Sequence, residues 1–74
     1  MCESTVYLVK DGKRTEFMKD VARIEIKGGA FVCSDILGDS RELKGAVLKD
    51  INLVGHEIVF VRDEGARVQG MPRT

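Results

Sequence analysis

Turn-forming dipeptides cut this chain into short segments at four places. Each pair stands between segments rich in Val, Ile, Phe or Tyr, and the four pairs are Asp11-Gly12, Gly28-Gly29, Gly38-Asp39 and Gly55-His56. Such punctuation is typical of β-hairpins, and Asp-Gly is a strong hairpin signal because both central residues of that turn tolerate positive φ. The sequence therefore predicts an all-β protein with tight connections.

The segments between the turns are expected to form strands. Those segments are residues 4–10, 13–17, 21–27, 30–36, 40–44, 46–53 and 56–62. Residues 43–51 also allow helical spacing, but Gly45 and β-branched residues weaken that alternative to a single helical turn. Five or six short antiparallel strands fit a small SH3-like or Sm-like barrel, closed or nearly closed, better than a sandwich, which needs more chain.

Residues 21–27 give the clearest strand pattern. Apolar and charged side chains alternate there, as a strand with one buried face requires: Ala22, Ile24 and Ile26 against Arg23, Glu25 and Lys27. We expect the apolar set to point inward and the charged set to face solvent.

The length of 74 residues allows one domain. We expect residues 1–62 to form the barrel and residues 63–74, with two glycines and the only proline, to be a flexible C-terminal tail or extension. A domain this small hides only about 60% of the surface of its unfolded chain. Its core is therefore marginal, and support from a disulfide, a metal or a partner chain is expected.

Two cysteines are too few for a disulfide framework, and charged residues 10–16 interrupt any secretory signal. A soluble, cytoplasmic protein with reduced thiols is expected. No apolar stretch approaches the roughly 18 residues of a membrane-spanning helix, so a membrane protein is not expected.

Twelve basic side chains are balanced by twelve acidic ones. Nucleic acid is disfavoured as a partner, because the chain has no net positive field to attract phosphates. The aromatic residues are expected in the core or a dimer interface rather than as base-stacking platforms: Tyr7, Phe17, Phe31 and Phe60.

Catalytic constellations are largely missing from the sequence. His56 is the only histidine, and no Gly-rich phosphate loop or Ser-His-Asp set is present. A turn histidine is most simply solvated, and His56 could serve as a ligand near the N-terminus only if its hairpin lies alongside the first strand. Cys33, on the same strand face as Phe31, is expected to be a small buried hydrophobic residue. The chain is predicted not to be an enzyme.

Cys2 directly follows the initiator methionine. Methionine is normally removed before a small residue, which would leave Cys2 with a free amine beside its thiol. The amine has a reference pKa of about 8 and the thiol about 8.5, so a divalent ion displaces two weakly held protons to close an N,S chelate. If Met1 is retained, its amine and the Cys2 amide still offer nitrogen beside the thiol.

Mixed nitrogen and thiolate donors suit nickel(II) or copper(II) better than zinc. One chain supplies too few ligands, whereas a symmetric dimer whose N-termini meet would offer two amines and two thiolates. The plain alternative is that Cys2 is an exposed terminal residue without a role.

Three segments together carry a family resemblance: MCESTVYL, VARIEIKGGAFVCSDILG and LKGAVLKDINLVGHEIVF. Over nearly all of residues 1–62, the chain resembles the CooT family of small nickel-binding proteins of anaerobic bacteria and archaea. The resemblance implies a homodimeric SH3-like barrel that binds one nickel(II) ion per dimer through Cys2. It also implies a role, as metallochaperone or nickel sensor, in maturation of carbon monoxide dehydrogenase. Because many family members are labelled only as RNA-binding, a small RNA-binding barrel stays open, as does a protein–protein adaptor.

Overall fold

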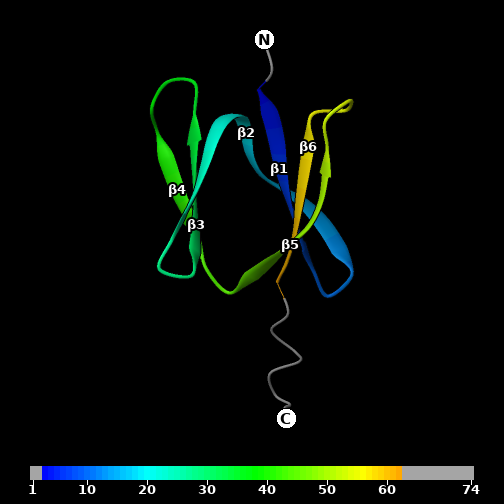
Figure 1. Cartoon of the computed structure of the whole chain (residues 1–74). Coiled ribbons are helices and arrows are strands. Elements are labelled where there is room, and N and C mark those ends of the chain that lie inside the picture. Colours follow the sequence, from blue (N-terminus) through cyan, green and yellow to red (C-terminus); the bar gives the residue numbers. More distant parts are fainter. Residues whose placement is uncertain (1–2, 63–74) are drawn as a thin grey trace.

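The computed structural model describes residues 3–62, which form six β-strands (Figure 1). The strands are β1 (Ser4–Lys10), β2 (Lys13–Lys27), β3 (Ala30–Asp35), β4 (Ser40–Leu43), β5 (Ala46–Asn52) and β6 (Glu57–Arg62). No helix occurs within residues 3–62, so the alternative of a helical turn at residues 43–51 is wrong and most of that segment is β5. Accordingly, no helix in this part of the chain is long and apolar enough to cross a membrane. The expected tail, residues 63–74, lies outside the described residues.

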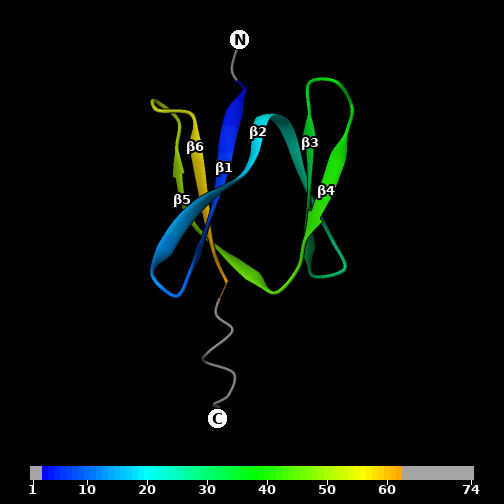
Figure 2. The ribbon, with the colours of Figure 1, turned by 180° about the vertical axis from the view of Figure 1, so that it is seen from behind.

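The strands form one mixed sheet in the order β4-β3-β2-β1-β6-β5. The sheet curls strongly (Figures 1 and 2). It does not close, because β4 and β5 are its two edges. Only residues 44–45 link these edges, and consecutive Cα atoms lie about 3.8 Å apart, so the edges stay within about 11 Å of each other at this end. A hydrogen bond from Arg62 Nη2 to the Lys44 carbonyl, at 2.9 Å, ties this link to β6.

This architecture confirms the expected small barrel-like fold, but one strand pair departs from the antiparallel expectation. β1 pairs in parallel with β6, from Thr5 opposite Glu57 to Lys10 opposite Arg62. The other four neighbouring pairs are antiparallel. The physical reason is the short link after β4, which carries the chain from one edge of the sheet to the other. As a result, β6 pairs with β1 on the side opposite β2.

β2 joins two segments that were expected as separate strands, residues 13–17 and 21–27. The strand continues through Asp20, whose φ of 54° is tolerated by a short polar side chain. Its pairing with β1 shifts register near this point, and its pairing with β3 shifts between Val21 and Arg23. These irregularities let one long strand bend across both halves of the sheet.

The core lies inside the curl of the sheet. Its buried residues come from five of the six strands: Val6, Met18, Val21, Cys33, Leu43 and Phe60. Phe31 packs against Phe60 with ring centroids 4.7 Å apart. Phe60 and Phe31 thus confirm the expected core role of these aromatic residues.

The expected inward face of residues 21–27 is only partly correct. Ile24 does pack against the core. Ala22 is exposed, because the register shift makes it the extra residue of a bulge and turns Val21 inward instead. Ile26 is 74% exposed, because the sheet is open where its side chain points.

Candidate functional site

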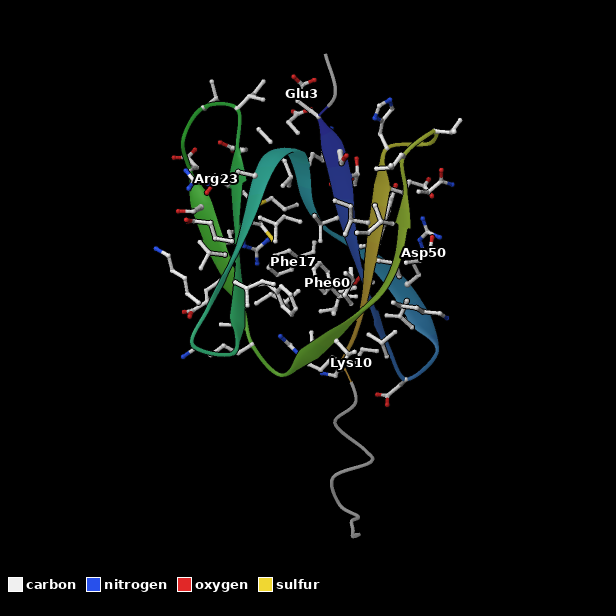
Figure 3. The ribbon with its side chains drawn as sticks, viewed as in Figure 1. Glu3, Lys10, Phe17, Arg23, Asp50 and Phe60 are labelled. Carbon is white, nitrogen blue, oxygen red and sulfur yellow. The ribbon has the colours of Figure 1, made fainter. Side chains whose placement is uncertain are left out.

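β1 begins at one extremity of the molecule, where Glu3 is labelled in Figure 3. We call this extremity the leading end. Two turns flank it: residues 53–56 between β5 and β6, and residues 36–39 between β3 and β4 (Figure 1). The Thr5 amide donates to the His56 carbonyl at 2.9 Å, which joins the first turn to β1. The Ile36 amide donates to the Asp20 carbonyl at 3.1 Å, which holds the second turn against the bend of β2.

His56 therefore lies beside the first strand. From the sequence, we expected His56 to be a possible ligand only if its hairpin lies alongside the first strand. The parallel pairing of β1 with β6 meets this condition. His56 is exposed and has a φ of 56°, so the expectation of a solvated turn histidine is also confirmed. Its backbone role in anchoring β1 leaves the imidazole unconstrained by that hydrogen bond.

Cys2, the predicted metal ligand, lies outside the described residues. Within residues 3–62, no group of three or more His, Cys, Asp and Glu side chains is arranged to hold a metal ion. A metal site at the leading end would therefore need donors from residues 1–2 or from a second copy of the chain.

Both flanking turns are fixed by a side-chain acceptor. The Asn52 Oδ1 atom accepts hydrogen bonds from the amides of Val54 (3.1 Å) and Gly55 (2.9 Å). The Asp35 Oδ1 atom accepts from the amides of Leu37 and Asp39, both at 2.9 Å. These Asx-type turns are rigid supports beside the start of β1.

The same two turns present large apolar side chains to solvent. They are Ile36, Leu37, Leu53 and Val54. Turn residues are usually polar, so this composition marks the leading end as a surface that differs from an ordinary solvated loop.

A second apolar surface is a groove between the two halves of the curled sheet. Its volume is about 200 Å³, and it is lined by seven apolar side chains: Ile24, Ile26, Phe31, Leu48, Ile51, Ile58 and Phe60. Phe60 is buried at the floor, while Ile26 of β2 and Leu48 and Ile51 of β5 are exposed at the rim. Sequence reasoning missed this groove. Its signal was the set of apolar residues in β5, but the sequence does not tell that β5 is an edge strand.

Cys33 lies in the core and confirms its expected role as a small buried hydrophobic residue. Burial raises the pKa of its thiol, while the guanidinium of Arg41, on the neighbouring strand β4, opposes this shift. Cys33 forms no disulfide bond and is a free thiol. A buried thiol with a raised pKa is a poor metal ligand, because metals bind the thiolate.

Tyr7 and Phe17 are each covered on one ring face by an arginine of the same chain. The Arg14 guanidinium lies 4.0 Å from the Tyr7 ring centroid and forms an ion pair with Glu57 at 3.2 Å. The Arg41 guanidinium lies 4.2 Å from the Phe17 ring centroid. An arginine stacked on a ring occupies one of the two faces on which a nucleic-acid base could stack.

Comparisons with known proteins give one relative by sequence and one by structure. An uncharacterised protein from Archaeoglobus fulgidus is 48% identical to this chain over 43 residues, which are 58% of this chain and 93% of that protein. The crystal structure of a protein assigned as CooT from Carboxydothermus hydrogenoformans matches with a TM-score of 0.75. That match covers 85% of this chain and 100% of the other at 24% identity, so it shows the fold.

The family model for the CO dehydrogenase accessory protein CooT matches residues 1–60. The matched range includes Cys2, all six strands nearly to the end of β6, and both turns at the leading end. The chain therefore belongs to the CooT family of CO dehydrogenase accessory proteins.

Proposed function

We propose that this chain is a nickel-binding accessory protein, a metallochaperone or nickel sensor, that serves the maturation of CO dehydrogenase. The nickel(II) ion is its cargo, held at the interface of a homodimer by Cys2 of each chain, with one ion per dimer. The observation that carries the proposal is the family match, since it begins at residue 1 and thus includes Cys2.

The donor chemistry of the leading end fits nickel(II). Cys2 offers a thiolate together with backbone or terminal nitrogen, and soft mixed N,S donor sets suit nickel(II). Cys2 precedes Thr5 by three residues, so an extended chain separates their Cα atoms by at most about 10–11 Å. Because the Thr5 amide binds the His56 carbonyl, the backbone of His56 lies beside the start of β1, on the side of the chain that leads to Cys2. His56 is therefore included in the proposal as an additional nitrogen donor.

A second copy of the chain would complete the site, because one Cys2 supplies too few donors and residues 3–62 hold no group of three or more His, Cys, Asp and Glu side chains arranged for a metal ion. A twofold arrangement doubles every donor of the leading end and yields four or more ligands from one short segment. The exposed apolar residues of this small domain support self-association, since a marginal core is commonly reinforced by a partner chain.

Native mass spectrometry of the reduced full-length protein, with and without nickel, tests the proposal. We expect a dimer that gains one nickel ion, together with a thiolate-to-nickel charge-transfer band in the ultraviolet–visible spectrum. In Cys2→Ser the band should vanish and the nickel affinity should fall more than about a hundredfold, a larger loss than that from removing an outer-shell partner. Nickel uptake by Cys2→Ser equal to that of the parent protein would refute the proposal.

His56→Asn examines the additional donor separately. Asparagine tolerates positive φ, so the turn should keep its shape. We expect a weaker nickel affinity with the thiolate band retained, whereas an unchanged affinity would remove His56 from the ligand set and leave Cys2 in it.

A further inference from the structure

We infer that the leading end docks onto the protein that receives the nickel ion, and that this acceptor meets it with a surface that is apolar at its centre and basic at its rim. The inference deepens the proposed function and rests on its metallochaperone form, because an acceptor is needed only if the chain delivers nickel. The docking surface consists of two turn tips, residues 36–37 and 53–54, together with the carboxylates around them.

The two tips carry the most exposed large apolar side chains within residues 3–62. Val54 is 92%, Leu37 83% and Leu53 79% exposed, whereas the next value, 74%, belongs to Ile26 on β2. Contact of aliphatic surface with water is unfavourable, and apolar side chains gathered at one end of a small domain indicate contact with another molecule. The leading end is therefore a candidate docking surface.

The tips are also preformed. Asn52 and Asp35 each accept two backbone hydrogen bonds inside the turns, and the amides of Thr5 and Ile36 tie the turns to the sheet. A surface that is already ordered loses little conformational entropy when it binds. The apolar side chains are thus presented on fixed supports on both sides of the start of β1 (Figure 1).

The leading end is acidic, although the net charge of the whole chain is zero. Lys19 is a cation at this end, and the carboxylates in or beside its turns and strand ends are Glu3, Asp20, Asp35 and Asp39. Within residues 3–62, no ion pair involves Glu3, Asp20 or Asp39. Their negative charge is therefore available to a partner.

The opposite end of the molecule, where β1 ends at Lys10 (Figure 3), has the reverse charge. Asp11 is an acidic residue there, and the basic residues at the strand ends and links are Lys10, Lys13, Lys27, Lys44 and Arg62. The ion pairs of Lys27 and Lys44 with glutamates, at 3.7 and 4.0 Å, are exposed and therefore weak. A chain with one acidic and one basic end is oriented by the field of its partner.

An acceptor protein satisfies the leading end best. Transfer of a metal ion brings donors of both proteins to the same ion, so the acceptor must touch the end of the chain that carries Cys2. The carboxylates around the apolar tips favour basic groups at the rim of the acceptor surface, because complementary charges steer and orient association.

Two other occupants are less suitable. A second copy would place the same carboxylates opposite one another, and like charges in contact are unfavourable. The proposed dimer requires only that Cys2 of each chain reach one ion, and it does not require the turn tips to be covered. A bilayer surface is disfavoured as well, because anionic headgroups repel the carboxylates beside the tips.

A matched pair of valine substitutions tests the apolar tips. Val54→Ser changes a tip, and Val47→Ser is the control, because Val47 is also exposed (65%) but lies in β5 toward the basic end. Surface plasmon resonance measures binding of the nickel-loaded protein to purified, nickel-free CO dehydrogenase of the same organism. We expect Val54→Ser to raise the dissociation constant at least about fivefold and Val47→Ser to leave it near the parent value.

A matched pair of aspartate substitutions tests the charge. Asp20 lies at the acidic end and Asp11 at the basic end, and both have a φ of 54°, which asparagine tolerates. We expect Asp20→Asn to lower the association rate about twofold at low salt, with the difference vanishing at high salt. Asp11→Asn should not lower this rate.

Circular dichroism and native mass spectrometry check the fold, the dimer and the nickel content of each variant, and all four should match the parent. Equal dissociation constants for Val54→Ser and Val47→Ser would overturn the inference. A weaker dimer in Val54→Ser would overturn it in favour of a second copy, and binding of the parent protein to phosphatidylcholine vesicles in favour of a lipid surface. A parent protein that takes up nickel but does not bind CO dehydrogenase would overturn the inference alone, whereas a parent that takes up no nickel would overturn the proposed function as well.

Discussion

β3 and β5 are of similar length and both begin with alanine and aliphatic or aromatic residues, yet their burial is opposite. β3 lies between β2 and β4, and its side chains are all buried or half-buried. β5 has β6 as its only neighbour in the sheet, and all of its side chains except Ala46 are exposed. The difference arises from position in the sheet and not from the apolar content of the two strands.

This contrast shows that the β5 edge of the sheet carries exposed apolar surface. The central half of the sheet buries its apolar residues against Phe60 and its neighbours. The edge at β5 exposes apolar residues that would release free energy if covered, at roughly 25 cal/mol for each Å² removed from water. An exposed apolar edge strand is normally protected, and a partner chain is one means of protection.

The largest effect on the free energy of unfolding is expected from a matched pair of Leu→Ala substitutions, one in the buried region around β3 and one on the exposed strand β5. Leu43 in β4, beside β3, is fully buried, whereas Leu48 in β5 is 42% exposed. We expect Leu43→Ala to lower the free energy of unfolding by about 2–5 kcal/mol, because it removes core contacts and leaves a cavity. Leu48→Ala should cost the monomer less than about 1.5 kcal/mol. Denaturant unfolding at low protein concentration measures both.

Equal losses at the two positions would break the comparison, because they would mean that β5 is buried in the isolated chain. A loss at Leu48 that grows with protein concentration would sharpen it, because a concentration-dependent stability indicates a dimer contact.

A smaller effect is expected at Arg41, which connects β4 to β2. Its guanidinium donates a hydrogen bond to the Phe17 carbonyl and lies over the Phe17 ring. Arg41→Met keeps an apolar stem over the ring but removes the charge and the hydrogen bond, so we expect a loss of about 1 kcal/mol in denaturant unfolding. The pKa of the Cys33 thiol should rise further, because Arg41 lowers it. Unchanged stability and unchanged thiol alkylation would contradict this account.

The smallest effect is a pH dependence contributed by Cys33. Its pKa is raised in the folded protein by burial, so its contribution to stability is full below the pKa of the unfolded thiol and is lost as the pH rises through the folded value. We expect the stability of the parent protein to fall relative to that of Cys33→Ala above about pH 9, near the ordinary thiol pKa. Parallel stability curves for the two proteins would show that the thiol does not titrate differently on folding.

The sequence predicted the strands well because their boundaries are local chemistry. The pair Asp11-Gly12 ends β1 as expected, and Gly28-Gly29 separates β2 from β3 with positive φ at both residues. The alternation around Ile24 gave the strand but not its faces, because the bulge at Ala22 inverts the pattern locally. Local signals thus define where strands lie and not which neighbours they acquire.

The long-range features needed the structure. The bend in β2 lies at Asp20, which has a positive φ. Glycine is the usual sequence signal for such a conformation, and this position is an aspartate, so the sequence did not indicate the bend. The parallel pairing of β1 with β6 follows from the short link at residues 44–45, which no single-strand pattern encodes. For the candidate site, sequence chemistry pointed to Cys2, and only the topology could bring His56 to the leading end.

The pairing of the first strand with the last also constrains how the domain is made. β1 sits in the middle of the sheet, and one of its two neighbours, β6, is the final strand of the described chain. A growing chain on the ribosome can form the β1–β2 and β2–β3 hairpins early, but β1 stays half-unpaired until residue 62 has emerged. The parallel ladder brings together residues about fifty positions apart, so closing that loop is a slow, late step. A truncated chain that lacks β6 would leave β1 without one of its two neighbouring strands. The leading end can therefore take its final structure only after the whole domain has been synthesised.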